Sequence, residues 1–177
     1  MIIFDLDGTL ADCSHRQHFV DALKLTYPWK VKSNINNTKY DAWCEKTGDR
    51  WKPDWLSFHE SCSEDKPIFP VIQLFWALRE EGHQIEIWSG RCNSVRQKTI
   101  DWLEQHIDDY ENWDKVLKMR PIGDYTPDDQ LKERWLDEAI TEGKTISCVF
   151  DDRPKVVRMW RKKGIFVFDV YQGNGDF

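Results

Sequence analysis

The sequence lacks an apolar run long enough to span a bilayer, and it lacks the cysteine and histidine spacings that hold zinc. Hydrophobic residues make up 40% of the 177 residues and charged residues 32%, which is usual for a folded, water-soluble protein. No basic segment precedes the apolar start, and Asp5 and Asp7 interrupt it, so it does not resemble a secretory signal. We therefore expect a cytoplasmic protein without a membrane partner and, at this length, a single domain over residues 1–177.

Positive charge is also in deficit, with 25 Lys and Arg against 31 Asp and Glu and a net charge of -6. This balance argues against duplex binding through overall electrostatics, although a local basic pocket would still accept a phosphorylated ligand. Cysteines are few and odd in number, and no two form a CxxC pair, so we expect reduced thiols in packing roles. They are Cys13, Cys44, Cys62, Cys92 and Cys148.

Tryptophan is abundant, with 10 residues in 177. Packing in the core is the favoured interpretation for most of them. Stacking on a nucleobase remains the alternative for one or two.

Apolar segments alternate with helical patterns along most of the chain. Such alternation predicts right-handed βαβ crossovers and an α/β fold, a three-layer Rossmann-like core around a parallel sheet. Glycines at the ends of two predicted helices, Gly82 and Gly143, and Pro127 near the start of another give the helix limits. The predicted strands are 1–7, 84–88, 115–119, 146–150 and 165–170, and the predicted helices are 70–82, 94–106 and 127–143.

Residues 13–66 interrupt this alternation of strands and helices. They contain a polar, aromatic-rich stretch between two segments of helical character. We expect a small, mainly helical, cap-like insertion after the first strand, in the position that usually controls access to a site at the end of the sheet.

Polar residues follow four of the predicted strands. In a parallel sheet these ends meet at one edge, so four aspartates would converge there, and a hard cation such as Mg²⁺ would offset their repulsion. The alternative is that the aspartates cap loops, for example Asp151 or Asp152 at the start of the helix within residues 153–163. The residues are Asp5, Asp7 and Thr9 after the first strand, Ser89, Gly90 and Arg91 after the second, Arg120 after the third, and Asp151, Asp152 and Arg153 after the fourth.

These residues resemble the ordered motifs of the haloacid dehalogenase (HAD) superfamily. DLDGT at 5–9 is similar to its DxDGT signature, Ser89 to its second motif, Lys132 to its third and Asp151-Asp152 to its fourth. The second aspartate is usual in members that transfer phosphate and absent from dehalogenases. The resemblance therefore implies a phosphatase.

Carried over to this chain, the resemblance implies that Asp5 is the nucleophile, forming an aspartyl-phosphate, and that Asp7 is the general acid and base. If the strand continues to Asp7, both side chains point the same way. Ser89 and Lys132 would hold phosphoryl oxygens. The implied Mg²⁺ ligands are Asp5, the main-chain carbonyl of Asp7 and one or both of Asp151 and Asp152.

The C-terminal part resembles more narrowly the 3′-phosphatase domain of bacteriophage polynucleotide kinase. The shared pattern is DDR, VV, MWR, a glycine and a closing GDF, together with SGR at 89–91 and GDYTPDDQLKE at 123–133. Residues 14–55 match weakly. By this resemblance Thr9, Gly90, Arg91, Arg120 and Arg153 are candidates for substrate binding, and Asp128 would orient Lys132 from one helical turn away.

The favoured function is therefore a magnesium-dependent phosphomonoesterase that removes 3′-phosphates from nucleic-acid ends. A phosphatase of free nucleotides or small phosphometabolites is the alternative, and a non-catalytic binding protein is a third. The sequence has no GxxxxGK[ST] phosphate loop, so we expect no kinase module in this chain. Oligomeric state is left open.

Overall fold

The fold is described from a computed structural model that covers residues 1–20, 53–107 and 112–170. Its centre is a five-stranded parallel sheet in the order β5-β4-β1-β6-β7. A smaller antiparallel pair joins β2 (Ala11–Asp12) to β3 (Lys66–Pro67). The strands of the main sheet are β1 (Ile2–Phe4), β4 (Ile85–Cys92), β5 (Leu117–Arg120), β6 (Cys148–Asp151) and β7 (Val167–Asp169).

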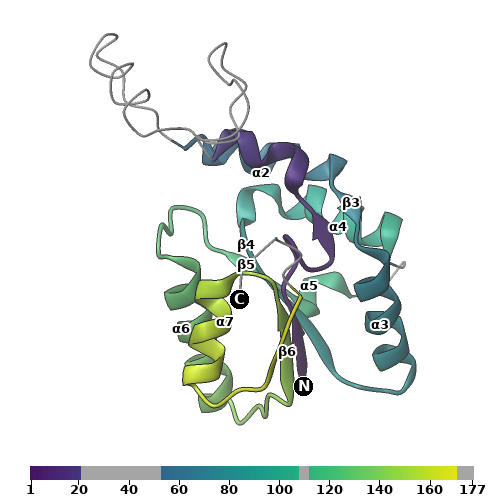
Figure 1. Ribbon diagram of the computed structural model, residues 1–177, viewed down its shortest axis with the longest axis vertical. Helices are drawn as coiled ribbons and strands as arrows, with labels where there is room; N and C mark the ends of the chain where they lie inside the picture. Colours follow the sequence, from purple (N-terminus) through teal and green to yellow (C-terminus); the bar gives the residue numbers. More distant parts are fainter. Residues whose placement is uncertain (21–52, 108–111, 171–177) are drawn as a thin grey trace, which may run out of the picture.

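Helices cover both faces of the sheet, as the alternation of segments predicted (Figure 1). Because successive side chains of a strand point to opposite faces, Ile2 and Phe4 join the apolar core under α3, α4 and α5, while Ile3 joins the core under α6 and α7. The helices are α2 (Trp55–Glu60), α3 (Phe69–Glu80), α4 (Arg96–His106), α5 (Trp113–Val116), α6 (Asp128–Thr141) and α7 (Pro154–Lys162). The three-layer Rossmann-like architecture is confirmed.

Several strand limits differ from the prediction, among them the end of β1, which lies at Phe4 rather than Asp7. The second strand does not stop at Trp88 but continues to Cys92, because β5 pairs with it as far as Cys92 opposite Arg120. Residues 113–116 form the short helix α5 rather than the start of a strand, and this turn buries Trp113 within 6.5 Å of the Phe75 ring centroid. Ser89, Gly90 and Arg91 therefore lie within β4 and not beyond it.

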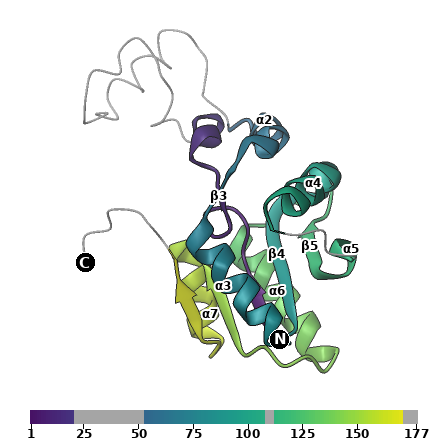
Figure 2. The same cartoon turned by 90° about the vertical axis from the view of Figure 1, so that its right-hand side faces the viewer.

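The described part of the insertion lies above the carboxyl ends of the main-sheet strands (Figures 1 and 2). It contains the 3-10 helices η1 (Ser14–Phe19) and η3 (Ser61–Glu64) together with α2. The β2–β3 pair joins its two ends. The remainder of the predicted insertion, 21–52, lies outside the described residues.

Tryptophan packing is confirmed for most of the indoles that the structure describes. Trp55 differs, with 47% of its surface exposed. Trp29, Trp43 and Trp51 are outside the described residues. The buried tryptophans are Trp88, Trp102, Trp113, Trp135 and Trp160.

The described cysteines, Cys13, Cys62, Cys92 and Cys148, are free thiols, whereas Cys44 lies outside the described residues. Gly82 and Gly143 follow α3 and α6 with φ of 81° and 79°, which confirms them as helix stops. Among the described residues no helix is long and apolar enough to cross a membrane.

Candidate active site

The candidate site lies at the carboxyl end of β1. β1 is the middle strand in the order β5-β4-β1-β6-β7. From β1 the chain first adds β4 and β5 on one side of the sheet, and then β6 and β7 on the other. The end of β1 is therefore at the topological switch point, where ligands bind in open α/β folds. A cavity of about 720 Å³ opens there. Its lining includes Asp5, Asp7, Lys132, Asp151 and Asp152.

Three carboxylates gather at this strand end. Register places Phe4 of β1 opposite Phe150 of β6, and the Asp5 amide donates to the Phe150 carbonyl at 2.9 Å, so Asp5 lies level with Asp151. Oxygens of Asp5, Asp151 and Asp152 lie within 4.8 Å of one another. The predicted convergence is thus found for three of the four aspartates.

Lys132 reaches this cluster from α6. Its Nζ donates to Asp5 Oδ1 at 2.7 Å and to Asp151 Oδ2 at 2.8 Å, and all three side chains are buried. The structure therefore brings together the residues of the first, third and fourth sequence motifs. Asp151 does not cap α7, since Arg153 occupies the cap position and no side chain caps the helix.

Burial and mutual repulsion raise the pKa of two of these carboxyls. The pKa of Asp5 is about 6, raised by burial and by Asp151 against the opposing charge of Lys132. The pKa of Asp152 is about 8, raised by burial and then by Asp5 and Asp151. Burial alone would lower the pKa of Lys132, but Asp151 and Asp5 outweigh it and keep the ammonium charged.

Gly8 provides the space for Asp152. Its φ of 87° is in the left-handed region, and a Cβ at this position would overlap the Asp152 carboxylate. The glycine of DLDGT is therefore required both by the turn after β1 and by the acidic cluster.

Asp7 is not part of that cluster, and the strand does not continue to it, so the condition under which Asp5 and Asp7 would point the same way is not met. β1 ends at Phe4, and the chain turns so that the Leu6 carbonyl accepts from the amides of Leu10 and Ala11, both at 2.9 Å. The Asp7 carboxylate instead accepts from Arg16 at 2.6 Å and from Arg91 at 2.5 Å.

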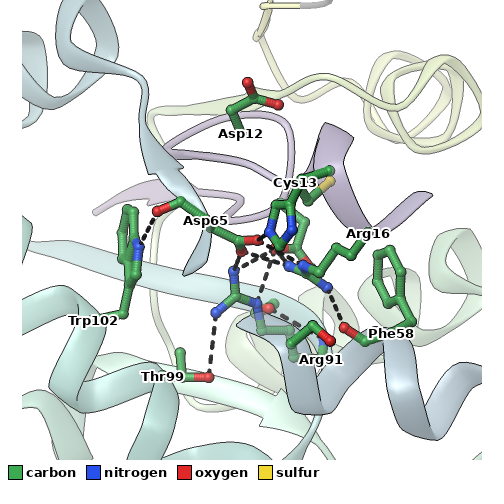
Figure 3. Close-up of polar contacts among 12 residues, drawn as sticks. Asp12, Cys13, Arg16, Phe58, Asp65, Arg91, Thr99 and Trp102 are labelled. Atoms are coloured by element: carbon green, nitrogen blue, oxygen red, sulfur yellow. Dashed lines mark hydrogen bonds and ion pairs between the residues drawn. The ribbon is translucent and has the colours of Figure 1, made fainter. Parts of the chain in front are cut away.

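Arg16, Arg91 and Asp65 are buried together (Figure 3). Both arginines also pair with Asp7, whose side chain is 20% exposed. Asp65 Oδ2 accepts from Arg16 at 2.6 Å and from Arg91 at 2.5 Å, so each arginine bridges both aspartates. Burial by itself would raise the pKa of Asp7, but Arg91 and Arg16 overcome it and hold that pKa well below its usual range. At neutral pH Asp7 is a carboxylate.

Sequence reasoning missed Arg16 and Asp65, and it gave Arg91 a contact to substrate. The Arg91 guanidinium is fully buried and is held by Asp7, Asp65 and Thr99, so its bonds are made within the protein (Figure 3). The signal for Arg16 was weak, because an arginine in a polar stretch is ordinarily solvated.

Asp128 does not orient Lys132. It pairs instead with Arg120 and with Arg153. Arg120 also donates to the Gly90 carbonyl at 2.9 Å and to the Thr126 carbonyl at 2.5 Å, which joins β4 to the loop before α6. A Cβ on Gly90 would come within 2.8 Å of Asp128 Oδ1, which explains the glycine.

Two candidate hydroxyls are buried beside the site. Ser89 Oγ accepts from the Arg91 amide at 3.2 Å. Thr9 Oγ1 is buried without a hydrogen-bond partner among the described residues. Gly90, Arg120 and Arg153 line the cavity, whereas Thr9, Ser89 and Arg91 are not part of its lining.

Known proteins resemble this chain in sequence and in fold. A protein-family model described as the polynucleotide kinase PNKP phosphatase domain matches residues 46–177. A "Putative bifunctional polynucleotide kinase/RNA ligase" of Autographa californica nuclear polyhedrosis virus is 38% identical over 134 residues, which cover 72% of this chain and 19% of that protein. The chain thus spans about a fifth of the length of that relative.

Solved structures share the fold. One from a structure of a Pnkp1/Rnl/Hen1 complex superposes with a TM-score of 0.64 at 25% identity, over 99% of this chain and 46% of the other. A hydrolase from Pseudomonas syringae gives a TM-score of 0.53 at 16% identity, over 95% and 83% of the two chains. The chain therefore belongs to the family of polynucleotide kinase PNKP phosphatase domains, which are phosphatases of the HAD type.

Proposed function

We propose that this protein is a magnesium-dependent phosphomonoesterase that removes 3′-phosphates from nucleic-acid ends through an aspartyl-phosphate. The observation that carries the proposal is the group of Asp5, Lys132, Asp151 and Asp152 in one cavity at the end of β1. The name of the viral relative supports the substrate class, since that protein is described as a polynucleotide kinase/RNA ligase.

In the first step a carboxylate oxygen of Asp5 attacks phosphorus, and the bond from phosphorus to the 3′ oxygen breaks. Lys132 holds Asp5 Oδ1 at 2.7 Å, which fixes the carboxylate and leaves Oδ2 for the attack. Its ammonium also offsets charge that develops on the phosphoryl oxygens. The proton for the departing alkoxide comes from Asp7.

In the second step Asp7 takes a proton from water, which attacks the aspartyl-phosphate and releases phosphate and free Asp5. The ionised form that Arg16 and Arg91 stabilise is the one needed to accept this proton. The acid form needed in the first step is favoured when the negative phosphate of the substrate lies beside Asp7 and opposes the two arginines.

The acidic cluster fits Mg²⁺ by its chemistry, because it offers oxygen atoms of three carboxylates within 4.8 Å. Asp5, Asp151 and Asp152 would hold the ion, together with the main-chain carbonyl of Asp7. When bound, it supplies positive charge that lets an anionic nucleophile approach an anionic phosphate.

Residues 13–66 are proposed as a cap over this cavity within a single domain of residues 1–177. Trp55, Leu56, Phe58 and His59 on α2 line the cavity, so a segment of the insertion forms one wall of it. Substrate choice would then depend on the insertion as well as on the core.

A phosphate-release assay tests the proposal. The substrates are a 3′-phosphorylated oligonucleotide, a 3′-mononucleotide and a sugar phosphate, each with Mg²⁺ and with EDTA. We expect the oligonucleotide to have the highest kcat/KM, and EDTA and Asp5→Asn each to abolish release. Much faster hydrolysis of the mononucleotide would favour a nucleotide phosphatase, and unchanged turnover by Asp5→Asn would refute the mechanism.

A further inference from the structure

Part of the rim of the catalytic cavity is apolar and aromatic, beside exposed charged groups such as Arg153 and Lys155. Four large side chains that line the cavity remain exposed, at 47% for Trp55, 68% for Leu56, 71% for Ile122 and 93% for Tyr125. Exposed apolar side chains that gather at one place mark a binding surface more often than scattered ones do. Here all four line the same cavity as Asp5 and Lys132.

From this arrangement we propose that Trp55 and Tyr125 form a base-binding subsite, where the nucleobase of the 3′-terminal nucleotide stacks while its 3′-phosphate reaches Asp5. The proposal rests on the proposed function, since it requires a nucleotide substrate. Aromatic faces accept every base, which suits an enzyme that acts on ends of varied sequence.

The indole of Trp55 is held in place by its own helix. Its ring centroid lies 5.7 Å from that of Phe58 and 6.1 Å from that of His59, to which it is nearly parallel at 29°. Asp54 fixes the start of the helix by accepting from the Ser57 amide at 3.0 Å. The exposed face of Trp55 is therefore presented in a defined orientation, which lowers the entropy cost of binding a base.

The helix of Trp55 is also joined to the catalytic residues. Arg16 donates to the Phe58 carbonyl at 3.0 Å, its guanidinium lies 4.1 Å from the Phe58 ring centroid, and the same group donates to Asp7 at 2.6 Å. This chain of contacts sets the position of the indole relative to the general acid. A base stacked on Trp55 would therefore have a fixed position relative to the reacting phosphate.

The backbone at Tyr125 is fixed on both sides. Arg120 donates to the Asp124 carbonyl at 3.2 Å and to the Thr126 carbonyl at 2.5 Å, and Asp124 Oδ1 accepts from the Thr126 amide at 2.9 Å. The Tyr125 side chain is nevertheless 93% exposed, so it does not stabilise the loop by packing. Contact with a ligand gives that exposed ring a role.

Size and chemistry favour a nucleotide over a small phosphometabolite. The cavity of about 720 Å³ is in the range that holds drug-sized ligands and is much larger than a phosphate group needs. A small polar sugar phosphate would leave the aromatic rim unused, whereas a base would cover it.

The test compares two 3′-phosphorylated oligonucleotides that differ only at the terminal nucleotide, one with a base and one abasic. Stacking is worth about 1–3 kcal/mol per base, so we expect the wild type to favour the base-bearing end by about 5- to 150-fold in kcat/KM. Trp55→Ala and Tyr125→Ala should each reduce this ratio, mainly through KM, and Trp55→Phe should restore part of it. The matched control is Phe69→Ala on α3, which removes an aromatic ring that is 57% exposed outside the cavity lining and should leave the ratio unchanged.

The outcomes separate the subsite from the proposed function. Equal kcat/KM for the two ends in the wild type, or an equal loss on both ends in the Trp55 and Tyr125 variants, would overturn the subsite while oligonucleotide hydrolysis continued. If neither oligonucleotide is hydrolysed but a sugar phosphate is, the proposed function itself fails.

Discussion

In the absence of divalent cations, the free energy of unfolding should fall as the pH rises from 6.5 to 8. The cause is Asp152, whose carboxylate faces Asp5, Asp151 and the ammonium of Lys132, and whose pKa rises from 3.8 to about 8. A raised carboxyl pKa means that the folded state binds more protons than the unfolded state. The free energy of unfolding therefore falls as pH rises, until the pH passes the folded pKa.

Between pH 6.5 and 8 the largest contribution to this slope comes from Asp152. The pKa of Asp5 is about 6, so its contribution is mostly lost below the window. Burial lowers the pKa of His59 to about 4, so His59 acts with the opposite sign between about pH 4 and 6.5. One retained proton is worth about 1.4 kcal/mol per pH unit, and only half of the Asp152 groups still retain it at pH 8, so the loss between pH 6.5 and 8 is about 1.5 kcal/mol.

Guanidinium denaturation in EDTA at constant ionic strength measures this loss. Mg²⁺ should reverse it, because an ion that binds only the folded state stabilises it and binds more tightly once Asp152 is ionised. Asp152→Asn should abolish the slope, whereas Asp137→Asn, which alters an exposed carboxylate on α6, should retain it. A flat profile in EDTA, or a slope that survives in Asp152→Asn, would refute the reasoning.

Three further variants test the site. Gly8→Ala should lower the free energy of unfolding by about 1–2 kcal/mol because of its left-handed backbone, and further because Asp152 is displaced; phosphatase activity should be lost. The control is Gly82→Ala, which has a similar φ but no atom within 4 Å of the added Cβ. It should show the backbone loss alone and keep full activity. Lys132→Met leaves its two partner carboxylates unpaired, so denaturation should show a loss of about 3–5 kcal/mol at neutral pH that shrinks in acid; wild-type stability would contradict the ion pairing. Asp65→Asn should lower the free energy of unfolding by a similar amount. It should also lower kcat, as measured by single-turnover phosphate release. An unchanged kcat would show that the cluster does not support Asp7.

The architecture was predictable because strands buried on both faces have a distinctive composition. Ile2, Ile3 and Phe4 are consecutive apolar residues that a half-exposed strand could not accommodate, and the structure places them on alternate faces of the central strand. Helix ends were also marked locally, by glycines such as Gly82 and Gly143. Local signals of this kind do not depend on distant contacts.

Strand ends were less predictable, since polar residues in a strand look like a loop. Ser89, Gly90 and Arg91 continue β4 because β5 supplies hydrogen-bond partners and the interior supplies counter-charges for Arg91. Both come from residues far along the chain. In the same way, Asp128 pairs with Arg120 and Arg153 rather than with Lys132, although Lys132 is one helical turn away.

The arginine–aspartate cluster shows why part of the site could not be predicted at all. Charged residues are ordinarily exposed, and burying one of these four alone would cost several kcal/mol. Two arginines and two aspartates together carry no net charge, so the group is tolerable only when all four are assembled. Arg16 and Asp65 come from the insertion, whereas Asp7 and Arg91 come from the core. The pKa of the proposed general acid therefore depends in part on the insertion being folded against the core, because Arg16 lowers it together with Arg91. No local pattern in the sequence records this relation.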